Sequence, residues 1–481
     1  MNNISNNINT HSAKSPSGDL GVKAPLRGLG ASKGSLKSTI AVSLTNYLDA
    51  GAIVAGASGL TLWQNYLGLT EGNLGWLNAI SANCFGAAIG AIIGGFLADK
   101  YGRKTIYTYN MLVYMLGIAI IMFSITFPML LLGFLVTGIS VGAGVPASWT
   151  YISESSEVGN RGRNIGISQF AWGVGPTIIL VLGMLLAPGK DDASAGVLFG
   201  FVQKVAALFL SDGASVATVN VFSSRIIFGS LFVVAFIAWM LQRKLEESKD
   251  WEESKATQLK TKQPGIFSSF GTLFTNKVNV KTMLFLAGIY ITWNFVAGVM
   301  GMFQPHIFET AGGLSSTQAN MLPAIQWLII IAVTYLGFAM FVDKINQRWF
   351  YFIGTSIGIA AWVILVFVGI KNLSALWTFT ILWGIHNGIG VQAFYALWSS
   401  ELFPSKYRAA AQGIMFFAVR GGAAIWSIGF TSIYATAGFN TAGYIMIGFL
   451  VFALIVGTVW TPKTRGKTLK QITEERYGDE I

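Results

Sequence analysis

The chain has 481 residues, of which 53% are hydrophobic and only 11% are charged. A soluble globular protein carries roughly 25% charged residues, so most of this surface does not face water. In a soluble protein the formal net charge of +11 would suit a nucleic-acid partner. Here the basic residues lie in short loops between apolar runs, where they orient a membrane protein. Composition therefore predicts an all-α polytopic membrane protein in a lipid bilayer and argues against nucleic acid as a partner.

The chain begins with a polar stretch. Residues 1–37 are rich in Ser, Asn, Gly and Lys and contain no apolar core. A cleaved signal peptide needs such a core, so this stretch is predicted to be a disordered cytoplasmic tail.

Twelve apolar segments follow, and each is long enough to cross a bilayer. They cover residues 38–66, 74–98, 105–124, 128–152, 162–188, 223–243, 281–305, 317–342, 347–370, 374–402, 408–435 and 440–461. Lys and Arg gather in alternate loops, which places both termini in the cytoplasm by the positive-inside rule. We therefore expect a multi-pass protein of the cell membrane, in a bacterial inner membrane.

The segments divide into two halves. We expect an N-terminal six-helix bundle at 38–243, a cytoplasmic linker at 244–280 and a C-terminal six-helix bundle at 281–462, followed by a cytoplasmic tail at 463–481. The connection at 189–222 contains a further apolar run. A thirteenth span there would reverse every later loop, so an interfacial or lid helix is predicted instead.

The two halves repeat one another. Asp99 and Asp343, each near the end of the second span of its half, are 244 residues apart. Glu154 and Glu401 are 247 residues apart, and so are Arg161 and Arg408. Duplicated six-helix units place a substrate site between the halves, near the bilayer midplane.

The loops that carry these pairs resemble those of the major facilitator superfamily. Its signature after span two is matched by Gly95, Leu97, Asp99, Gly102, Arg103 and Lys104. Two further loops resemble patterns of the superfamily's sugar-porter branch. The residues that match are Pro146, Tyr151, Ile152, Glu154, Arg161 and Gly162 in the first loop, and Ser400, Glu401, Phe403, Pro404 and Arg408 in the second. The resemblance implies the major facilitator fold with 12 transmembrane helices and transport by alternating access.

Charged residues at these loops are candidates for a cytoplasmic gate. They are Asp99, Arg103, Glu154, Arg161, Arg163, Asp343, Glu401 and Arg408. Acid–base pairs that form only when this face is closed would bias the protein toward the outward-facing state. The alternative is that the charges only set topology. Because acidic residues contribute little to topology, the gating role is favoured.

One carboxyl lies inside the membrane. Asp49 is in the middle of the first span, where desolvation disfavours its charged form and suits it to carry a proton. It resembles the acid that proton-coupled sugar porters hold in span one. Those porters place an arginine in span four, but Gly133 stands at that position. A carboxyl that only packs against a neighbouring helix is the alternative.

Arg420 is a second charge at membrane depth, roughly 12 residues into span eleven. It resembles an arginine of organic-acid symporters, and it either pairs with Asp49 or binds a substrate carboxylate. Other candidate substrate-binding residues are Gln169, Trp172, Asn294, Asn387 and Gln392. Amides suit a hydroxylated solute because they both donate and accept hydrogen bonds. His386 is more readily explained as a satisfied core histidine than as a proton relay.

These features predict a secondary active transporter that couples protons to uptake of a polyhydroxylated solute, a sugar or an inositol. The alternative is an organic-anion (carboxylate):proton symporter that uses Arg420. The three histidines, His11, His306 and His386, are far apart in the sequence, and no phosphate loop or nucleophile constellation appears. We therefore expect no enzyme, no cofactor and no metal, and a transporter that functions as a monomer.

Overall fold

The computed structural model describes residues 33–81, 84–101, 103–155, 161–189, 194–211, 213–244, 273–342, 344–403, 405–465, 467 and 469–478. The predicted tail up to residue 32 and most of the predicted linker, residues 245–272, lie outside the described residues. Every regular element in the described part of the chain is a helix.

The helices fall into two groups along the chain. The first group is α1 (Lys33–Leu67), α2 (Glu71–Ile80), α3 (Phe85–Tyr101), α4 (Arg103–Met122), α5 (Phe127–Ser155), α6 (Arg161–Leu185), α7 (Phe199–Ala207) and α8 (Val216–Gln242). The second group is α11 (Lys277–Thr310), α12 (Ser316–Val333), η1 (Thr334–Ala339), α13 (Gln347–Val368), α14 (Leu373–Ile389), α15 (Val391–Glu401), α16 (Ser405–Val459) and α17 (Leu469–Tyr477).

Each predicted apolar segment coincides with helix, and this confirms the all-helical fold class. By length and composition, eight of the described helical stretches suffice to cross a membrane, and two shorter apolar helices add to them. Some spans differ in detail from the prediction. The second is interrupted between α2 and α3, and the tenth is divided at Gly390. The last two predicted spans are borne out, because α16 consists of two helices that meet at a kink at Gly438 (φ 77°).

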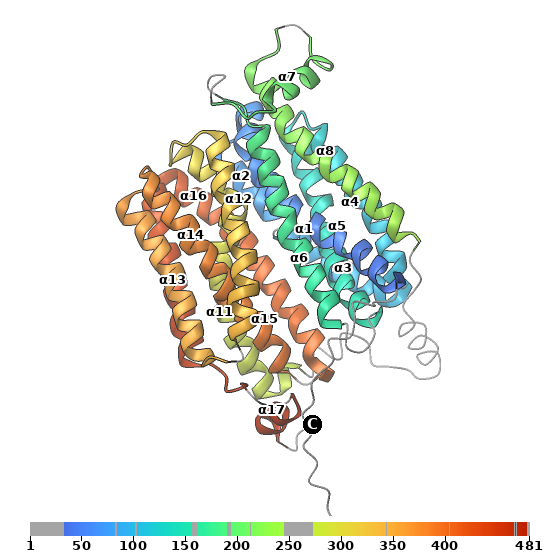
Figure 1. The fold of residues 1–481 in the computed structure, drawn as a ribbon, viewed down its shortest axis with the longest axis vertical. Helices are drawn as coiled ribbons and strands as arrows, with labels where there is room; N and C mark the ends of the chain where they lie inside the picture. The colour runs from blue at the N-terminus through green and yellow to red at the C-terminus, as the bar shows by residue number, and fades with distance from the viewer. Residues whose placement is uncertain are drawn as a thin grey trace, which may run out of the picture.

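The two groups of helices lie side by side (Figure 1). They meet where α6 packs on α12, α2 and α3 pack on α16, and α1 packs on α11. Elements that are far apart in the sequence thus line one interface, as two duplicated bundles require. The interface holds the candidate site described below.

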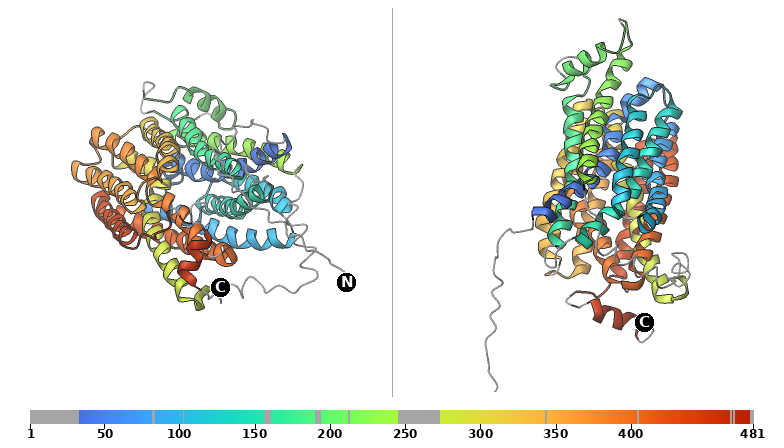
Figure 2. Two further views of the ribbon diagram at one scale, coloured as in Figure 1. Left: turned by 60° about the horizontal axis from the view of Figure 1, so that its bottom comes forward. Right: turned by 90° about the vertical axis from the view of Figure 1, so that its right-hand side faces the viewer.

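Two short helices lie at opposite ends of the bundle (Figures 1 and 2). The nine residues of α7 extend over about 14 Å, too little to span a bilayer, so the expectation that 189–222 adds no thirteenth span is confirmed. At the other end, α17 lies in the predicted C-terminal tail. Its Tyr477 hydroxyl donates to Asn279 Oδ1 at 2.7 Å and to the carbonyl of Leu402 at 3.2 Å, which fastens this part of the tail to the second half.

Glycines let α3 and α5 approach closely. A Cβ on Gly142 would lie 2.1 Å from the carbonyl oxygen of Ala87, and a Cβ on Gly90 would lie 2.1 Å from that of Ile139. Backbone atoms cannot rotate away as a side chain can. Small residues at such crossings therefore allow the two helices to pack.

Replacing Gly142 with alanine is accordingly expected to destabilise the protein by about 3 kcal/mol, the upper end of the cost of overpacking. The loss is measured as a lower midpoint of thermal unfolding in detergent, followed by size-exclusion chromatography. Gly448→Ala is the control, because no atom lies within 4 Å of its added Cβ. Equal midpoints for the two variants would contradict the packing assigned to Gly142.

Candidate functional site

A cavity lies between the two halves, with residues of α1 and α6 on one side and of α11, α12, α14, α15 and α16 on the other. Its volume of about 120 Å³ corresponds to roughly ten water-sized volumes. The first half contributes Ala50, Ile53, Val54, Ala57, Trp172 and Leu180. The second half contributes the polar groups, which are Tyr290, Trp293, Asn294, Gln304, Gln326, Trp327, Trp383, Asn387, Gln392 and Arg420.

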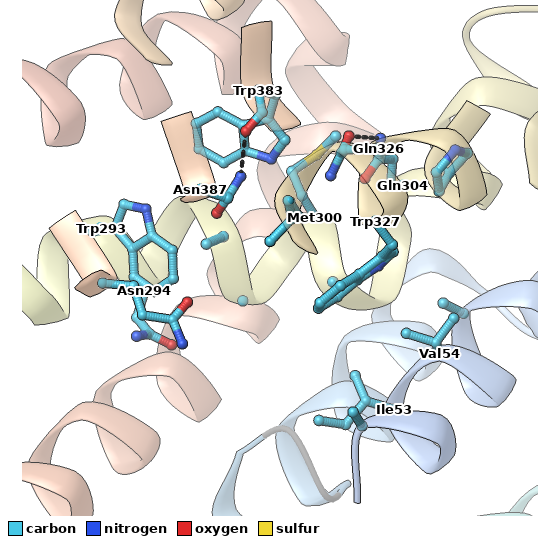
Figure 3. Close-up of a pocket in the computed structure, with 18 of the residues that line it drawn as sticks. Ile53, Val54, Trp293, Asn294, Met300, Gln304, Gln326, Trp327, Trp383 and Asn387 are labelled. Atoms are coloured by element: carbon cyan, nitrogen blue, oxygen red, sulfur yellow. Dashed lines mark hydrogen bonds between the residues drawn. The ribbon is translucent and has the colours of Figure 1, made fainter. Parts of the chain in front are cut away.

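Amide side chains dominate the polar wall (Figure 3). Gln304 Nε2 donates to Gln326 Oε1 at 2.8 Å, and Asn387 Nδ2 donates to the carbonyl of Trp383 at 2.7 Å. Each amide offers two N–H donors and an acceptor oxygen. These two bonds use only part of this capacity, so both a donor and an acceptor remain for a solute at each pair.

The indole rings supply the apolar part of the wall. Trp172 of α6 meets Trp327 of α12 edge-on across the interface, with ring centroids 5.3 Å apart. Trp293 stacks on Tyr290, with centroids 5.7 Å apart. Such rings present a flat apolar face beside the amides, an arrangement suited to a ring-shaped solute with polar edges.

Asp49 lies behind this wall and not in it. It is 6% exposed, and its Oδ2 accepts a hydrogen bond of 3.2 Å from Trp172 Nε1. The positive charge of Arg420 also acts on its carboxyl group. The guanidinium of Arg420 stacks 4.9 Å from the ring of Phe416. The buried carboxyl of the first half is thus in electrostatic contact with a cavity residue of the second.

Gly133 explains why span four supplies no arginine to Asp49. A Cβ at this position would lie 2.6 Å from Ile121 Cγ1 and 2.9 Å from Ile121 N. The position serves the close packing of α5 against α4. A long side chain cannot be accommodated there without moving one of the two helices, so the cation near Asp49 comes from α16 instead.

His386 is a satisfied core histidine in this structure. Its ring is fully buried. Nε2 accepts from Trp293 Nε1 at 3.1 Å, and Nδ1 lies 2.9 Å from the carbonyl of Gly354. Because a carbonyl only accepts, Nδ1 carries the proton and the imidazole is neutral. These bonds are those of the satisfied core histidine that the sequence favours.

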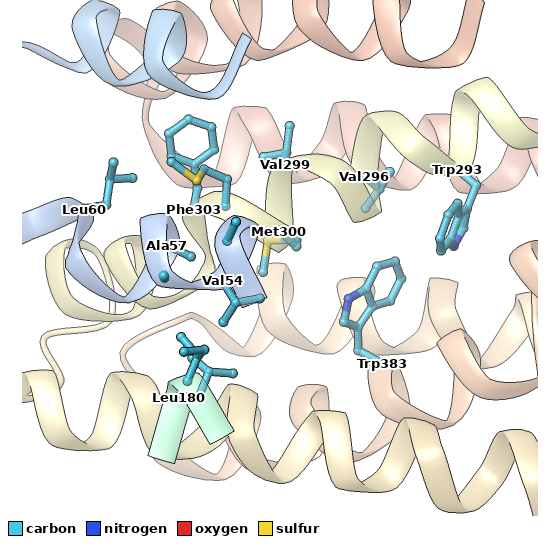
Figure 4. Close-up of a cluster of buried hydrophobic side chains, with 14 of the residues drawn as sticks. Val54, Ala57, Leu60, Leu180, Trp293, Val296, Val299, Met300, Phe303 and Trp383 are labelled. Carbon is cyan, nitrogen blue, oxygen red and sulfur yellow. The ribbon is translucent and has the colours of Figure 1, made fainter. Parts of the chain in front are cut away.

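Beside the amides, the interface between the two halves is apolar. Val54, Ala57, Leu60 and Leu180 of the first half face Val296, Val299, Met300 and Phe303 of α11 (Figure 4). Leu60, Leu180 and Phe303 are each 1% exposed. Val54, Ala57, Leu180 and Met300 of this apolar layer also line the cavity, whereas Leu60 and Phe303 continue the layer outside the lining.

The cavity contains five of the six predicted substrate-binding residues, namely Trp172, Asn294, Asn387, Gln392 and Arg420. The side chain of the sixth, Gln169, lies outside the described residues. Sequence reasoning missed Gln326 and Trp327 in α12. Gln326 could have been found from the sequence, because a polar residue inside an apolar span is a functional candidate by default. Trp327 is its neighbour in the chain.

Most side chains of the predicted gating residues lie outside the part of the chain that the structure describes. The side chains of Asp99, Arg103, Glu154, Arg161, Arg163, Asp343 and Arg408 lie outside the described residues. Only Glu401 is described among them; it is the half-buried last residue of α15. The gating role therefore stays a prediction.

The chain is similar to proteins of known type over most of its length. The model of the family "Sugar (and other) transporter" matches residues 62–475. The minor myo-inositol transporter IolF of Bacillus subtilis is 39% identical over 444 residues, which are 92% of this chain and 94% of that protein. The niacin transporter NiaP of Acinetobacter baylyi is 32% identical over 120 residues, 25% of this chain and 27% of that protein.

The fold has solved counterparts. The crystal structure of a D-xylose-proton symporter aligns with a TM-score of 0.69 at 19% identity, over 90% of this chain and 99% of that one. These relatives are transporters and not enzymes. With the two related halves and the cavity between them, the matches assign the chain to the sugar (and other) transporter family, the sugar-porter branch of the major facilitator superfamily.

Proposed function

We propose that this protein takes up a polyhydroxylated solute, a sugar or a cyclitol such as inositol, together with protons, by alternating access. The observation that carries the proposal is that the solute-binding amides and the buried carboxyl lie on opposite sides of the interface between the halves. Among the described side chains, the amides that line the cavity lie in the second half, whereas the buried carboxyl of Asp49 lies in the first. A solute bound between the halves would therefore be recognised by amides of the second half and coupled to a proton on Asp49 of the first half.

The chemistry of the wall supports the substrate class. A ring polyol presents alternating hydroxyl donors and acceptors on its edge and carbon-bound hydrogens on its face. Asn294, Gln304, Gln326, Asn387 and Gln392 offer both donors and acceptors. The indoles of Trp293 and Trp383 offer an apolar face. The names of the relatives, a myo-inositol transporter and a D-xylose-proton symporter, point to the same class.

Asp49 is proposed to carry the proton. With the cavity open to the outside, its carboxylate takes up a proton and the solute binds the amides. The halves then rock, and the proton and solute leave on the inner side. Trp172 links the two events, since it donates to Asp49 and also lines the cavity. The predicted acid–base pairs at the cytoplasmic loops would latch the inner gate during the outward-facing phase.

A second candidate function follows from Arg420, the only cation among the described residues that line the cavity. In an organic-anion:proton symporter it would bind the carboxylate of the substrate. The partial match to a niacin transporter favours this class. We rank it second because Arg420 also acts on Asp49 and so already has an electrostatic role.

The two classes are distinguished by counterflow in proteoliposomes, in which labelled solute exchanges without a proton gradient. Labelled myo-inositol, D-xylose and nicotinate are compared. We expect exchange of at least one polyol and none of nicotinate. Gln304→Leu is expected to weaken polyol affinity about tenfold, because one buried hydrogen-bond partner is lost. Gln203→Leu, an exposed glutamine of α7, is the matched control. Exchange of nicotinate alone would overturn the polyol assignment.

Trp172→Phe tests the link between solute and proton. The ring remains, but the N–H that donates to Asp49 Oδ2 is removed. Such a donor favours the charged carboxylate. Without it, the midpoint of the pH dependence of uptake is expected to rise by up to about one pH unit, the size of one net hydrogen bond.

The pH profile of proton-driven uptake measures this shift, and counterflow at fixed pH monitors binding. Trp76→Phe is the control, because Trp76 of α2 is 49% exposed and is not among the described residues that line the cavity. Identical pH profiles for wild type, Trp172→Phe and Trp76→Phe would contradict the linking role.

A further inference from the structure

A second polar cluster joins the two halves near the end of the bundle that carries α7. At its centre is His306 of α11, which is only 1% exposed. Its Nδ1 lies 3.0 Å from the hydroxyl of Thr61 in α1, and its Nε2 lies 3.3 Å from Glu71 Oε1 in α2. Gln64 Nε2 also donates to that carboxylate oxygen at 3.1 Å. Both ring nitrogens of a histidine in the second half are thus held by the first half.

A second carboxyl belongs to the same cluster. Glu309 of α11 accepts from the Ser316 hydroxyl at the start of α12, and its charge acts on His306. At Thr310, one turn beyond His306, the hydroxyls of Thr310 and Tyr434 are 2.7 Å apart, which joins α11 to α16. The titratable groups that face one another here are Glu71 from α2, His306 and Glu309 from α11, and Tyr434 from α16.

The cluster is separate from the proposed proton site. Thr61 directly follows Leu60, and His306 is three residues beyond Phe303. Leu60 and Phe303 belong to the apolar layer beside the cavity (Figure 4), whereas Asp49 lies 12 residues before Thr61 in α1, about 18 Å along the helix. Beyond the layer, the Thr317 hydroxyl donates to the carbonyl of Ser194, in the connection that leads to α7. The cluster therefore lies between the apolar layer and the α7 end, which the positive-inside rule assigns to the outer face.

We propose that Glu71, His306 and Glu309 form a second proton-binding site, and that its protonation holds the outer ends of the two halves together. The proton acts as a ligand that lowers the net negative charge of the cluster. Both carboxyls interact with His306, so with a neutral imidazole the partly buried cluster holds two negative charges that no positive charge of the cluster balances. One added proton, on the imidazole or on a carboxyl, leaves the cluster with at most one net negative charge.

The consequence concerns the conformational equilibrium. Glu71 comes from the first half, and His306 and Glu309 come from the second, so their attraction exists only while the outer side is closed. A ligand that binds one of two states shifts the population toward that state. Acidification of the outer solution is therefore expected to favour the outward-closed state, and alkaline solution to favour opening.

The test measures the distance between the outer ends in nanodiscs without solute. A Cys84→Ala background removes the single cysteine. Spin labels are placed on Asn65→Cys in the first half and Ala437→Cys in the second, both exposed positions at this end. Double electron–electron resonance is then recorded from pH 5 to pH 8. We expect the ratio of short to long distances to fall at least about tenfold as the pH rises, which corresponds to release of one proton.

Three variants assign the effect to the cluster. Glu309→Gln keeps the shape and the acceptor for Ser316 but removes one charge, so it is expected to stay closed, with less than a twofold change over the same range. Lys204→Gln removes an exposed charge of α7 and is expected to titrate like wild type. Asp49→Asn removes the proton of the proposed coupling site, so the pH dependence that remains in this variant belongs to the cluster, and a fall in the ratio is expected to remain.

A wild-type distance ratio that does not depend on pH would overturn the proposal. So would a Glu309→Gln variant that titrates like wild type, or an Asp49→Asn variant that no longer titrates. No solute is present, so failure of this experiment is distinguishable from failure of the polyol assignment, which counterflow tests.

Discussion

Proteoliposomes that contain Asp49→Asn are expected to equilibrate the solute but not to concentrate it. Asparagine has nearly the same shape as aspartate and can still accept from Trp172 Nε1, but it takes up no proton. One proton moving down one pH unit supplies about 1.4 kcal/mol, enough for roughly tenfold accumulation of a co-transported solute. Wild type is expected to approach this ratio and the variant to remain near one.

Accumulation of labelled solute is measured under an imposed pH gradient, and counterflow is measured in parallel. Counterflow needs no net proton movement, so it is expected to persist in Asp49→Asn. Accumulation by the variant equal to that of wild type would remove Asp49 from the coupling mechanism. Loss of both activities would indicate that Asp49 is structural.

Neutralising Arg420 is expected to have the next largest effect. Its positive charge acts on Asp49 and favours the ionised carboxylate, which must form when the proton is released inside. Arg420→Gln is therefore expected to slow the initial rate of proton-driven uptake about tenfold, since a nearby opposite charge changes the proton equilibrium of a carboxyl by about that factor or more. Arg420→Lys retains the charge and is expected to retain most of the activity.

The same pair of variants separates the two candidate functions. If Arg420 bound a substrate carboxylate through its planar fork, lysine would be a poor replacement, and both variants would fail in transport of nicotinate. Arg243→Gln is the matched control, because Arg243 also stacks on an aromatic ring, 4.9 Å from Trp239, but is exposed at the end of α8. Equal loss with Gln and with Lys would contradict a purely electrostatic role.

Much of the fold follows from the sequence for a simple physical reason. A helix must present about 20 apolar residues to cross the bilayer, and such runs are visible without any knowledge of packing. The breaks inside them are less visible. Span ten reads as one apolar run, but it divides at Gly390, whose N–H donates to the carbonyl of His386 at 2.6 Å. Nothing in the hydropathy of residues 374–402 indicates that break.

The candidate site could be predicted only in part, for a related reason. Depth in the membrane identifies Asp49, Asn294, Asn387 and Arg420 as candidates, but which neighbour each one meets depends on how helices pack. Trp172 and Asp49 are 123 residues apart, and no local pattern pairs them. His306 appears isolated in the sequence because its partner Glu71 is 235 residues away. Such partners become visible only when the two halves are assembled.

The central claim, uptake of a polyol with protons, is tested most directly by external pH in a lightly buffered, de-energised suspension of cells that express the protein. Pulses of inositols, sugars and organic acids are added to cells with wild type or Asp49→Asn. We predict alkalinisation when a cyclitol or sugar is added to wild type and none with the variant. A response to organic acids alone, or entry of labelled polyol without proton movement, would contradict the claim.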